Sequence, residues 1–510
     1  MEFTLRGDYF MGQFSRSNGV SEADVAKSAE SISKTSPANT GHHLWDAYID
    51  YQNNDKIIES AQSGFEIWRK IPMEERVEYL QGFQEAANKK KEEIGRAIAL
   101  ETGKPLWESM TEAGGLVAKV NVTVTDSLER IAQETITQVL PNIDGHTIKK
   151  PIGPCLVIGP FNFPCHLANG QILAALLAGN SVVFKPSEKT MYSAQLLIEC
   201  FHEAGFPAGV VNLVNGSAKT TQDILKHPSV KGIFFTGSLN VGKKILESVG
   251  TDLTKLVALE LGGKNSTILH SDADINHALP ELLRACFLSA GQRCTSTSLI
   301  AVHRSIEQEF IAKFKEAAQR IIIDHPIDYK SQPFMGPLID EAALNTYENY
   351  LKLAKENGAE EILSPQQVEA SFPGHYVSPS IHFLKQAAVT KENPFTQEEV
   401  FGPNCCFIPY ENIEDAIAIA NISDYGLAAS VFTQDKDIYE LCLRDIQSGL
   451  INLNRSTVGA SSRLPFGGVK NSGNYRPAAV SMIDHTVSTV SSLETLDNSS
   501  KLDDVKGLKK

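Results

Sequence analysis

The chain has 510 residues, of which 42% are hydrophobic and 21% are charged, and its formal net charge is -14. Because one ordinary hydrophobic core rarely serves so long a chain, we expect about two or three packed units. The negative balance argues against a surface that binds nucleic acid or an anionic membrane. Composition and charge therefore predict a soluble, acidic globular protein.

The cysteines and the apolar segments indicate the cellular compartment in which the protein is expected. The eight cysteines are sparse and irregularly spaced, and no two are arranged as C-x-x-C. Such spacing is not typical of a disulfide framework or a zinc ribbon, and it favours a reducing compartment. The N-terminal residues lack the pattern of a signal peptide, and no apolar run approaches the length of a membrane span. We therefore expect a cytoplasmic protein without a metal centre.

The N-terminal part of the chain is predicted to be mostly helical. Residues 1–50 show weak patterning, and we expect them to wrap the surface. Apolar side chains then recur at helical spacing between residues 56 and 70. Pro72 suits the first turn of a second helix, and Gly103 marks the end of a third. A fourth helical stretch is expected from residue 107 to about residue 133.

A hairpin is predicted next. Residues 136–140 and 146–150 are strand-like, and Asp144 with Gly145 between them is a typical hairpin turn. The strands are polar and alternate poorly, which favours a projecting arm over a part of the core. Strand-like residues return in 472–497, and we expect them to complete this arm as an intersubunit sheet of a homodimer or homotetramer.

Short apolar runs alternate with helical segments from residue 155 to residue 260, and again from residue 262 to about residue 464. Runs that are apolar throughout are typical of strands buried on both faces, as in a parallel sheet covered by helices. The predicted fold class is therefore α/β, with two doubly wound parallel-sheet domains. Ligands of such sheets bind at the carboxyl ends of the strands, in the loops that follow the runs.

Cys294 follows a glycine at the break between a helical pattern, residues 280–289, and an apolar run, residues 299–302. A thiolate at such a break can add to an electrophilic carbonyl. The alternative is that Cys294 is a small buried hydrophobe, as most free cysteines are. It becomes a nucleophile only if a base, an oxyanion donor and a cofactor site lie nearby.

Two other residues carry the chemistry that a reactive cysteine needs. Asn162 follows an apolar run between two prolines, which would hold its amide as a donor to an oxyanion. The alternative is a rigid turn with a self-bonded asparagine. Glu260 ends another apolar run beside two glycines, where desolvation raises the pKa of a carboxyl group and favours a general base. Its alternative is a surface turn.

Two further strand ends have the residues of a nucleotide site. Lys185 and Glu188 follow one apolar run at a spacing that suits a ribose diol, and a capped helix start is the equal alternative. Gly237 and Ser238 follow another run, where backbone N–H groups and a hydroxyl at a helix start suit a phosphate. Many strand-to-helix turns share this second pattern, so it is weak on its own.

In their order along the chain, these residues resemble the motif series of the NAD(P)-dependent aldehyde dehydrogenases. The resemblance spans about residues 55–490, and residues 399–403 and 465–473 are similar to the later motifs of that family. The domains expected on this basis are 1–135 with 153–261 for NAD binding, 262–464 for catalysis, 136–152 with 472–497 as the oligomerisation arm, and 498–510 as a disordered tail.

The resemblance implies a mechanism. Cys294 adds to the aldehyde carbon, while the amide of Asn162 and the backbone N–H of Cys294 hold the oxyanion. Hydride then leaves the thiohemiacetal for the nicotinamide, and Glu260 activates the water that hydrolyses the thioester. The implied cofactor contacts are Lys185 and Glu188 at the adenine ribose, Gly237 and Ser238 at the pyrophosphate, Glu399 at the nicotinamide ribose, and Phe401 packed nearby. The Glu188 carboxylate would repel a ribose 2′-phosphate, which favours NAD over NADP.

Within the family, residues 101–108, 161–170 and 472–477 look like the N-succinylglutamate semialdehyde dehydrogenases of arginine catabolism. This resemblance implies oxidation of N-succinyl-L-glutamate 5-semialdehyde to N-succinyl-L-glutamate, with succinate semialdehyde or another semialdehyde as the alternative. Tyr475 stands where that subfamily has histidine, and Lys264 where it has asparagine. These departures bear on the substrate and not on the reaction.

A substrate with two carboxylates needs cationic partners, and arginine offers a matching fork. Arg293 lies beside the nucleophile, and Arg463 and Arg476 flank Phe466, the substrate-side residue of the last motif. We expect Arg476 to bind a carboxylate, with Arg463 second, whereas Arg293 can instead point into the packing behind Cys294. Each arginine taken alone is more often a structural or surface residue.

Two other classes of function are compatible with parts of the sequence. A cysteine hydrolase or acyltransferase would use Cys294 and Glu260 without a nicotinamide cofactor, and the paired cofactor signals argue against it. A structural or binding protein without activity is disfavoured because Cys294, Glu260 and Asn162 are all present.

Overall fold

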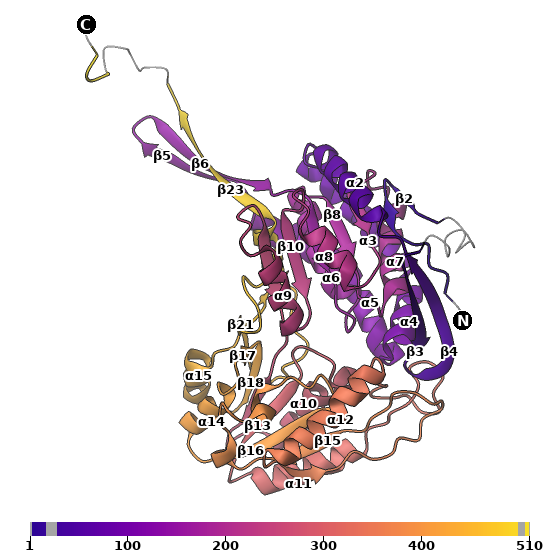
Figure 1. Ribbon diagram of the computed structural model, residues 1–510. Coiled ribbons are helices and arrows are strands. Elements are labelled where there is room, and N and C mark those ends of the chain that lie inside the picture. The colour runs from indigo at the N-terminus through magenta and orange to yellow at the C-terminus, as the bar shows by residue number, and fades with distance from the viewer. Residues whose placement is uncertain (1–2, 17–27, 498–504, 509–510) are drawn as a thin grey trace.

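The computed structural model describes residues 3–16, 28–497 and 505–508. Most of the tail that was predicted to be disordered lies outside the described residues. Two α/β lobes, each built on a seven-stranded sheet, lie against each other, and a three-stranded arm projects from them (Figure 1). This arrangement confirms the predicted fold class. Within the described ranges, no helix is both long enough and apolar enough to cross a membrane.

The sheet of the first lobe contains all the apolar runs between residues 155 and 260. In spatial order its strands are β11 (Leu256–Glu260), β10 (Gly232–Thr236), β7 (Cys155–Ile158), β8 (Val182–Lys185), β9 (Val211–Leu213), β1 (Tyr9–Phe10) and β2 (Gln13–Phe14). Strands β7 to β11 are parallel, and β1 pairs with β9 in the antiparallel sense. The strand order reverses between β7 and β10, and open α/β sheets bind ligands at such a switch point.

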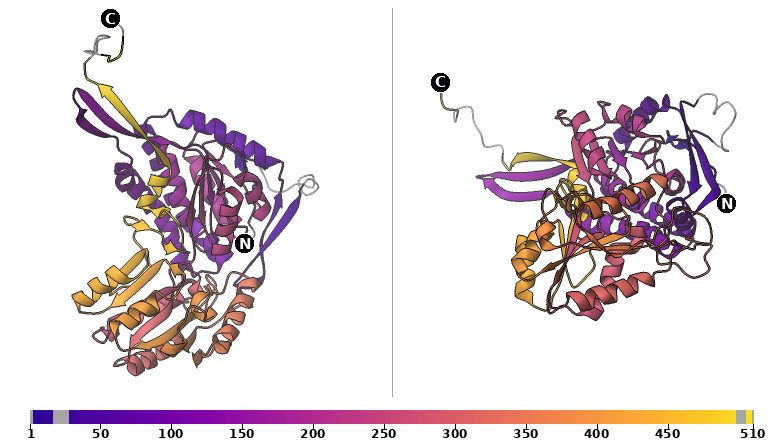
Figure 2. Two further views of the ribbon diagram at one scale, coloured as in Figure 1. Left: turned by 60° about the vertical axis from the view of Figure 1, so that its left-hand side comes forward. Right: turned by 60° about the horizontal axis from the view of Figure 1, so that its bottom comes forward.

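Helices cover both faces of this sheet (Figures 1 and 2). One apolar cluster joins one face to α2 (Asn53–Trp68), α8 (Ala218–Leu225) and α9 (Leu239–Val249). A second cluster joins the other face to α3 (Met73–Lys89), α4 (Lys91–Thr102), α5 (Leu106–Val122), α6 (His166–Ala178) and α7 (Met191–Glu203). Because α6 contacts both the sheet and α5, residues 168–178 are buried throughout. The loops at the carboxyl ends of the strands are thereby left as the open edge.

The first 50 residues do more than wrap the surface, so that expectation is wrong in part. They form the antiparallel hairpin of β3 (Glu30–Ser36) and β4 (Asn39–Ile49), and Trp45 of β4 is buried in the core of the first lobe. The tip of the hairpin also touches the second lobe, where the His375 N–H donates to the carbonyl of Pro37 at 2.9 Å. The N-terminal hairpin therefore joins the two lobes.

The second lobe has a sheet of the same size. In spatial order its strands are β14 (Glu360–Leu363), β15 (Ser380–Phe383), β16 (Asn404–Tyr410), β13 (Thr297–His303), β12 (Asn265–Leu269), β18 (Ala428–Phe432) and β19 (Leu450–Leu453). All neighbours are parallel except β14 and β15. The helices are α10 (Ile275–Phe287), α11 (Glu307–Gln319), α12 (Glu341–Glu356), α13 (Pro394–Gln397), α14 (Ile413–Ala420) and α15 (Lys436–Asp445).

The arm consists of β5 (Glu134–Leu140), β6 (Ile143–Pro151) and β23 (Val487–Thr495), with β6 in the middle. Figure 2 shows it standing clear of both lobes. The hairpin turn is Pro141–Asn142, with φ 59° at Asn142, and not Asp144–Gly145, which pair within β6. Asp144 instead accepts a bond from the N–H of Gln138 at 2.7 Å.

Short elements complete the chain near the junction of the lobes. They are η1 (Thr123–Ser127), η2 (Leu288–Gly291), η3 (Gln386–Ala388), β17 (Tyr425–Gly426), β20 (Pro465–Phe466), β21 (Val469–Lys470), β22 (Ala478–Ala479) and η4 (Val480–His485). Both β22 and η4 pack on α6, so of the segment 472–497 only the part from Val487 onward runs along the arm.

Candidate active site

Cys294 lies in the loop between α10 and β13. All eight cysteines are described and unbridged; seven are buried, and Cys294 is half-buried. Just before it, Ser289 and Ala290 in η2 have left-handed φ values of 54° and 53°. Such backbone strain costs about 1–3 kcal/mol per residue and is concentrated at functional sites. Cys294 is therefore held on a strained loop with some access to solvent, unlike a small hydrophobe of the core.

Side chains from both lobes hold this loop. The Nδ2 of Asn162 donates to the carbonyl oxygen of Gln292 at 3.0 Å, and the Nδ2 of Asn265 donates to the carbonyl oxygen of Cys294 at 2.7 Å. The Oδ1 of Asn162 also accepts the N–H of Phe163 at 3.1 Å, so the self-bonded turn considered for this residue is present. An amide has two N–H donors, and one bond to Gln292 leaves the second for a ligand beside the cysteine.

Glu260, at the end of β11, is 1% exposed and is not part of a surface turn. Neither of its carboxyl oxygens has a hydrogen-bond partner of good geometry among the described residues. Burial raises the pKa of Glu260 to about 8, and the charge of Glu399 adds to this shift, while contact with the Cys294 thiol opposes it. Burial, followed by the charges of Glu260 and Glu399, also raises the pKa of Cys294 well above its usual range. The thiol and the carboxyl group therefore compete for one negative charge, which makes Glu260 a proton acceptor poised near neutral pH.

Glu399 is the second buried acid of the site. Its Oε1 accepts the N–H of Gly263 at 3.0 Å, and burial raises its pKa to about 7. A Cβ at Gly262 would lie 2.1 Å from Oε2 of Glu399, so only glycine admits the carboxyl group here. Phe401, with φ 52°, packs edge to face on Phe161 with the ring centroids 5.8 Å apart. The motif of residues 399–403 thus lies directly against the two glycines that follow Glu260.

Lys185 and Glu188 lie at the carboxyl end of β8. Lys185 is buried, and its Nζ lies 3.6 Å from a carboxyl oxygen of Glu188, which is 46% exposed. The alternative of a capped helix start at this point is wrong, because α7 begins only at Met191. The pair therefore presents one anchored cation and one accessible carboxylate at the edge of the sheet.

Gly237 and Ser238 lie at the carboxyl end of β10. Ser238 is the N-cap of α9, where its hydroxyl accepts the N–H of Val241 at 3.5 Å. The N–H of Gly237 donates to the carbonyl oxygen of Glu260 at 3.0 Å, which links this turn to the general base. The N-terminus of α9 and the pair at Lys185 lie on one edge of the first sheet, and the buried Glu399 faces that edge from the second lobe. This arrangement fits a dinucleotide such as a nicotinamide cofactor.

The three arginines proposed for the substrate all have protein partners. Arg293 donates to the buried carboxylate of Glu108 at 2.6 Å and to the Ser289 hydroxyl at 2.9 Å, and so points into the packing behind the cysteine loop. Arg476 donates through Nη1 to the carbonyl oxygens of Gly467 and Gly468 at 3.0 and 2.8 Å. No described residue accepts from its Nε or Nη2.

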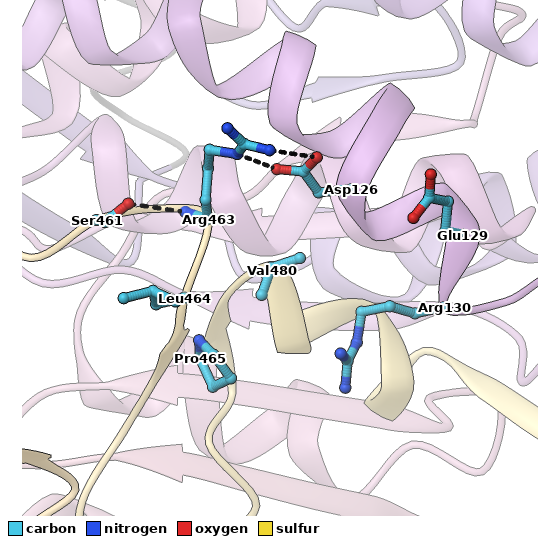
Figure 3. A pocket seen from close by; sticks show the side chains of 8 residues that line it. All are labelled: Asp126, Glu129, Arg130, Ser461, Arg463, Leu464, Pro465 and Val480. Atoms are coloured by element: carbon cyan, nitrogen blue, oxygen red, sulfur yellow. Dashed lines mark hydrogen bonds and ion pairs between the residues drawn. The ribbon is translucent and has the colours of Figure 1, made fainter.

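Arg463 lies at the rim of a hollow of about 720 Å³ between η1, η4 and residues 461–465 (Figure 3). Its guanidinium points toward Asp126 and donates to it at 2.6 Å. Arg130, on the other side of the hollow, is paired with Asp484 at 3.0 Å. Phe466 lies next to this region in β20, paired with Ala478 of β22. The hollow is thus rimmed by arginines that acidic neighbours already neutralise.

Sequence reasoning missed the polar residues of α5. Glu112 accepts the backbone N–H groups of Cys165 and His166 at 3.1 and 3.2 Å, which caps the start of α6. It also forms a buried ion pair with Lys104, which in turn donates to the carbonyl oxygen of Asn162 at 2.8 Å. Polar residues at helical spacing on an otherwise apolar face were the available signal. Glu112 acts through Lys104 on the loop of Asn162, and Glu108 bonds to Arg293 in the loop of Cys294, so these acids hold both loops in place.

Comparison with known proteins agrees with this geometry. The family model "Aldehyde dehydrogenase family" matches residues 25–491. The chain is 35% identical over 493 residues to the N-succinylglutamate 5-semialdehyde dehydrogenase of Legionella pneumophila strain Corby, covering 96% of this chain and 95% of that protein. It is 38% identical over 468 residues to the enzyme of the same name from Sphingopyxis alaskensis, covering 92% and 95%.

Solved structures are similar over the whole fold. Betaine aldehyde dehydrogenase from Staphylococcus aureus in complex with NAD+ has a TM-score of 0.89 at 26% identity, covering 99% of this chain and 97% of that one. An NADP-dependent enzyme from E. coli has a TM-score of 0.88 at 28% identity, covering 97% and 98%. Together with the cysteine, its buried base and the nucleotide edge, these matches show that the chain belongs to the aldehyde dehydrogenase family.

Proposed function

We propose that the protein oxidises N-succinyl-L-glutamate 5-semialdehyde to N-succinyl-L-glutamate with NAD. The observation that carries the reaction is the buried, unpartnered carboxyl group of Glu260 against the thiol of Cys294. The substrate is supported by the similarity to the two relatives named for this semialdehyde. The unbridged state of all eight cysteines supports the cytoplasm as the compartment.

Each step of the proposed reaction has a residue of this chain. The Cys294 thiol releases its proton to solvent, and the thiolate sulfur adds to the aldehyde carbon while the carbonyl π electrons move to oxygen. The free N–H of Asn162 and the backbone N–H of Cys294 hold that oxyanion. When bound, the nicotinamide would accept the hydride that leaves this carbon as the oxyanion re-forms its C=O bond, which leaves a thioester on Cys294. Glu260 then takes a proton from water, which attacks the thioester, and the C–S bond breaks to release the carboxylate product and the thiolate.

The preference for NAD over NADP rests on Glu188. Its carboxylate is 46% exposed at the end of β8, where it can accept the hydroxyls of a ribose and would repel a 2′-phosphate. Lys185 is the nearest cation, and its ammonium group is already paired with Glu188. The remaining cofactor contacts that we propose are Gly237 and Ser238 at the pyrophosphate, Glu399 at the nicotinamide ribose, and Phe401 beside the ring.

On the substrate side we propose Phe466 as an apolar contact and Arg476 as the carboxylate ligand. The Nε and Nη2 atoms of Arg476 have no acceptor among the described residues, so their N–H groups can donate to a carboxylate. Arg463 is the second choice, since a carboxylate there must compete with Asp126. Arg293 is a positioning residue in this proposal, because its charge is matched by Glu108.

The test mixes the purified protein with NAD or NADP and one of three aldehydes: N-succinylglutamate semialdehyde, succinate semialdehyde, or an uncharged aldehyde of similar length. We expect the growth of NADH absorbance to be fastest with NAD and the N-succinylated substrate. A clear preference for succinate semialdehyde or for the uncharged aldehyde would contradict the proposed substrate. Equal rates with NADP would contradict the role of Glu188.

A further inference from the structure

A polar face of α5 runs from the cysteine loop along the start of α6. Glu108, Glu112 and Lys119 lie on this face at spacings of four and seven residues. Glu108 is bonded to Arg293 beside the nucleophile, and Glu112 caps α6. Lys119 lies about two helical turns farther along on the same face. Unlike Glu108 and Glu112, it has no partner of opposite charge within the described ranges.

Lys119 is an ammonium group without a partner. It is 3% exposed, and its Nζ has no hydrogen-bond or ion-pair partner in the described part of the chain. The other buried lysines of that part are Lys34, Lys104, Lys185 and Lys264, and each of them donates to an oxygen. Burial alone lowers the pKa of Lys119 to about 8. A buried charge left without a partner is strongly disfavoured, and a protein retains one where a ligand supplies the counter-charge.

Other buried polar groups near Lys119 also lack partners among the described residues. A Cβ at Gly170 would lie 3.3 Å from Cε and 3.9 Å from Nζ of Lys119, so the lysine extends over a glycine of α6. On the same side of α6, Nδ1 of His166 and Oδ1 of Asn169 are also buried without partners. Gly115 of α5 makes space for the His166 ring, since a Cβ there would lie 2.9 Å from Nδ1. One cation on α5 and one unused amide oxygen on α6 thus both lie where these two helices pack.

This group of residues lies on and beside the helix that follows Asn162. Asn162, whose amide is bonded to the cysteine loop, precedes α6 by four residues, and Gly170 follows the first residue of α6 by one turn, about 5.4 Å along the helix axis. Lys119, which lies against Gly170, is therefore near the start of the helix that follows the candidate oxyanion donor Asn162.

We propose that Lys119 binds the α-carboxylate of an N-acylated amino-acid semialdehyde, and that the Oδ1 of Asn169 accepts the N–H of the adjacent amide. The ammonium group matches the carboxylate, and the unpartnered oxygen matches a donor on the neighbouring nitrogen. The proposal rests on the proposed function and names the residues that select its substrate class.

The experiment compares three aldehydes: N-succinylglutamate semialdehyde, 5-oxopentanoate, which lacks the N-succinylamide with its carboxylate, and pentanal, which has no carboxylate at all. Lys119→Met is expected to lower kcat/KM about a hundredfold for both carboxylates, mainly through KM, and to change pentanal by about twofold or less. Lys119→Arg should keep most of the preference for carboxylates. Asn169→Leu should lower kcat/KM only for the N-succinylated substrate, by about tenfold relative to its effect on 5-oxopentanoate.

Lys34→Met is the matched control, because Lys34 is also buried with a pKa lowered to about 8 but lies in the N-terminal hairpin. It should leave the ratio between charged and uncharged aldehydes unchanged. The melting temperature gives an independent readout: replacing an unpartnered buried ammonium by an apolar side chain should raise it in Lys119→Met. A lower melting temperature with equal loss for all three aldehydes would assign Lys119 a structural role and overturn the inference.

Unchanged kinetics in Lys119→Met would overturn it as well, because the ligand then has no contact with the ammonium group. These outcomes differ from failure of the proposed function itself. If the wild-type protein oxidises pentanal as well as N-succinylglutamate semialdehyde, the substrate assignment fails before any variant is considered. If the wild-type protein prefers the carboxylates and Lys119→Met keeps that preference, only the role of Lys119 is lost.

Discussion

At the scale of single residues, Cys294 is distinguished from the other cysteines by its access and its neighbours. It is half-buried on a strained loop, whereas the other seven cysteines are buried in helices, in strands or, for Cys165, in the turn before α6. We expect Cys294→Ala to abolish aldehyde oxidation while NAD still binds, because Lys185 and Ser238 are unchanged. Turnover is measured by NADH absorbance and binding by calorimetry. Cys442→Ala, the control, should keep turnover; activity in Cys294→Ala would assign the nucleophile elsewhere.

Glu260 is expected to control the release of the product. In Glu260→Gln the water that attacks the thioester loses its base, so a pre-steady-state burst of NADH should be followed by slow turnover. Stopped-flow measurement separates the two phases. If the burst itself disappears while the protein stays folded, Glu260 acts before hydride transfer and the assignment to water activation is wrong.

The pH dependence follows from the raised pKa of Glu260. Because the base is the ionised form and its pKa is about 8, steady-state turnover should rise with pH and level off above about pH 8. Below that point the rate should fall by up to tenfold per pH unit. The same acid binds a proton in the folded state between its ordinary value of 4.5 and about 8, where the unfolded chain has released it, so its contribution to stability falls as pH rises through that window.

Glu260→Gln gives the check on both effects. It should flatten the pH profile of turnover, and it should raise the melting temperature more at pH 8 than at pH 5. A profile that keeps its rise near pH 8 in the variant would assign the titration to another group, with Glu399 the nearest buried acid.

At the scale of elements, one buried carboxylate ties three segments together. Glu101, in the last turn of α4, accepts the Trp45 indole N–H at 2.7 Å and the N–H groups of Tyr192 and Ser193 at 2.9 and 2.8 Å. It therefore caps the start of α7, whose own N-cap residue makes no side-chain cap bond. The charge of Glu101 thus replaces a local cap by a long-range one.

Glu101→Ala is expected to lower the free energy of unfolding by about 3–5 kcal/mol, because it leaves several buried donors without an acceptor. Urea unfolding measures the change. The exposed Glu93 of the same helix provides the control, and Glu93→Ala should shift stability by about 0.5 kcal/mol or less. A loss in Glu101→Ala no larger than that of the control would contradict the capping role.

At the scale of the whole molecule, the arm presents apolar side chains far from either core. Ile136 and Leu140 on β5 are 62% and 50% exposed, and β5 is an edge strand with an unpaired side. Exposed edges of this kind pair with or pack on another chain. We therefore propose that the arm joins subunits of a homodimer or homotetramer.

Ile136→Asp with Leu140→Asp is expected to reduce the assembly to smaller species, measured by sedimentation at micromolar concentration. Leu253→Asp is the matched control, because Leu253 is 99% exposed in a turn outside the arm. It should leave the sedimentation unchanged. A wild-type protein that sediments as a monomer would contradict the role of the arm, as would an assembly that survives the double substitution.

The sequence by itself determined the parts whose signals are local. Continuous apolar runs specify strands buried on both faces, and for that reason β7, β8, β9, β10 and β11 all lie in residues 155–260, where such runs alternate with helical segments. Cys294, Glu260 and Asn162 were found in the same way, since each stands in the loop or at the strand end that its short motif predicts. The structure then brings them together because the carboxyl ends of β7 and β11 in the first lobe face the loop before β13 in the second lobe.

Only the tertiary structure decided what depends on distant partners. Tyr9 forms a strand because it pairs with Leu213, and no local pattern in either segment predicts that pairing. The three candidate arginines look alike in the sequence, and their different neighbours distinguish them: Glu108 holds Arg293, whereas part of Arg476 stays free. Lys119 reads as an ordinary helix residue until the packing of α5 on α6 removes water from its ammonium group without supplying a partner.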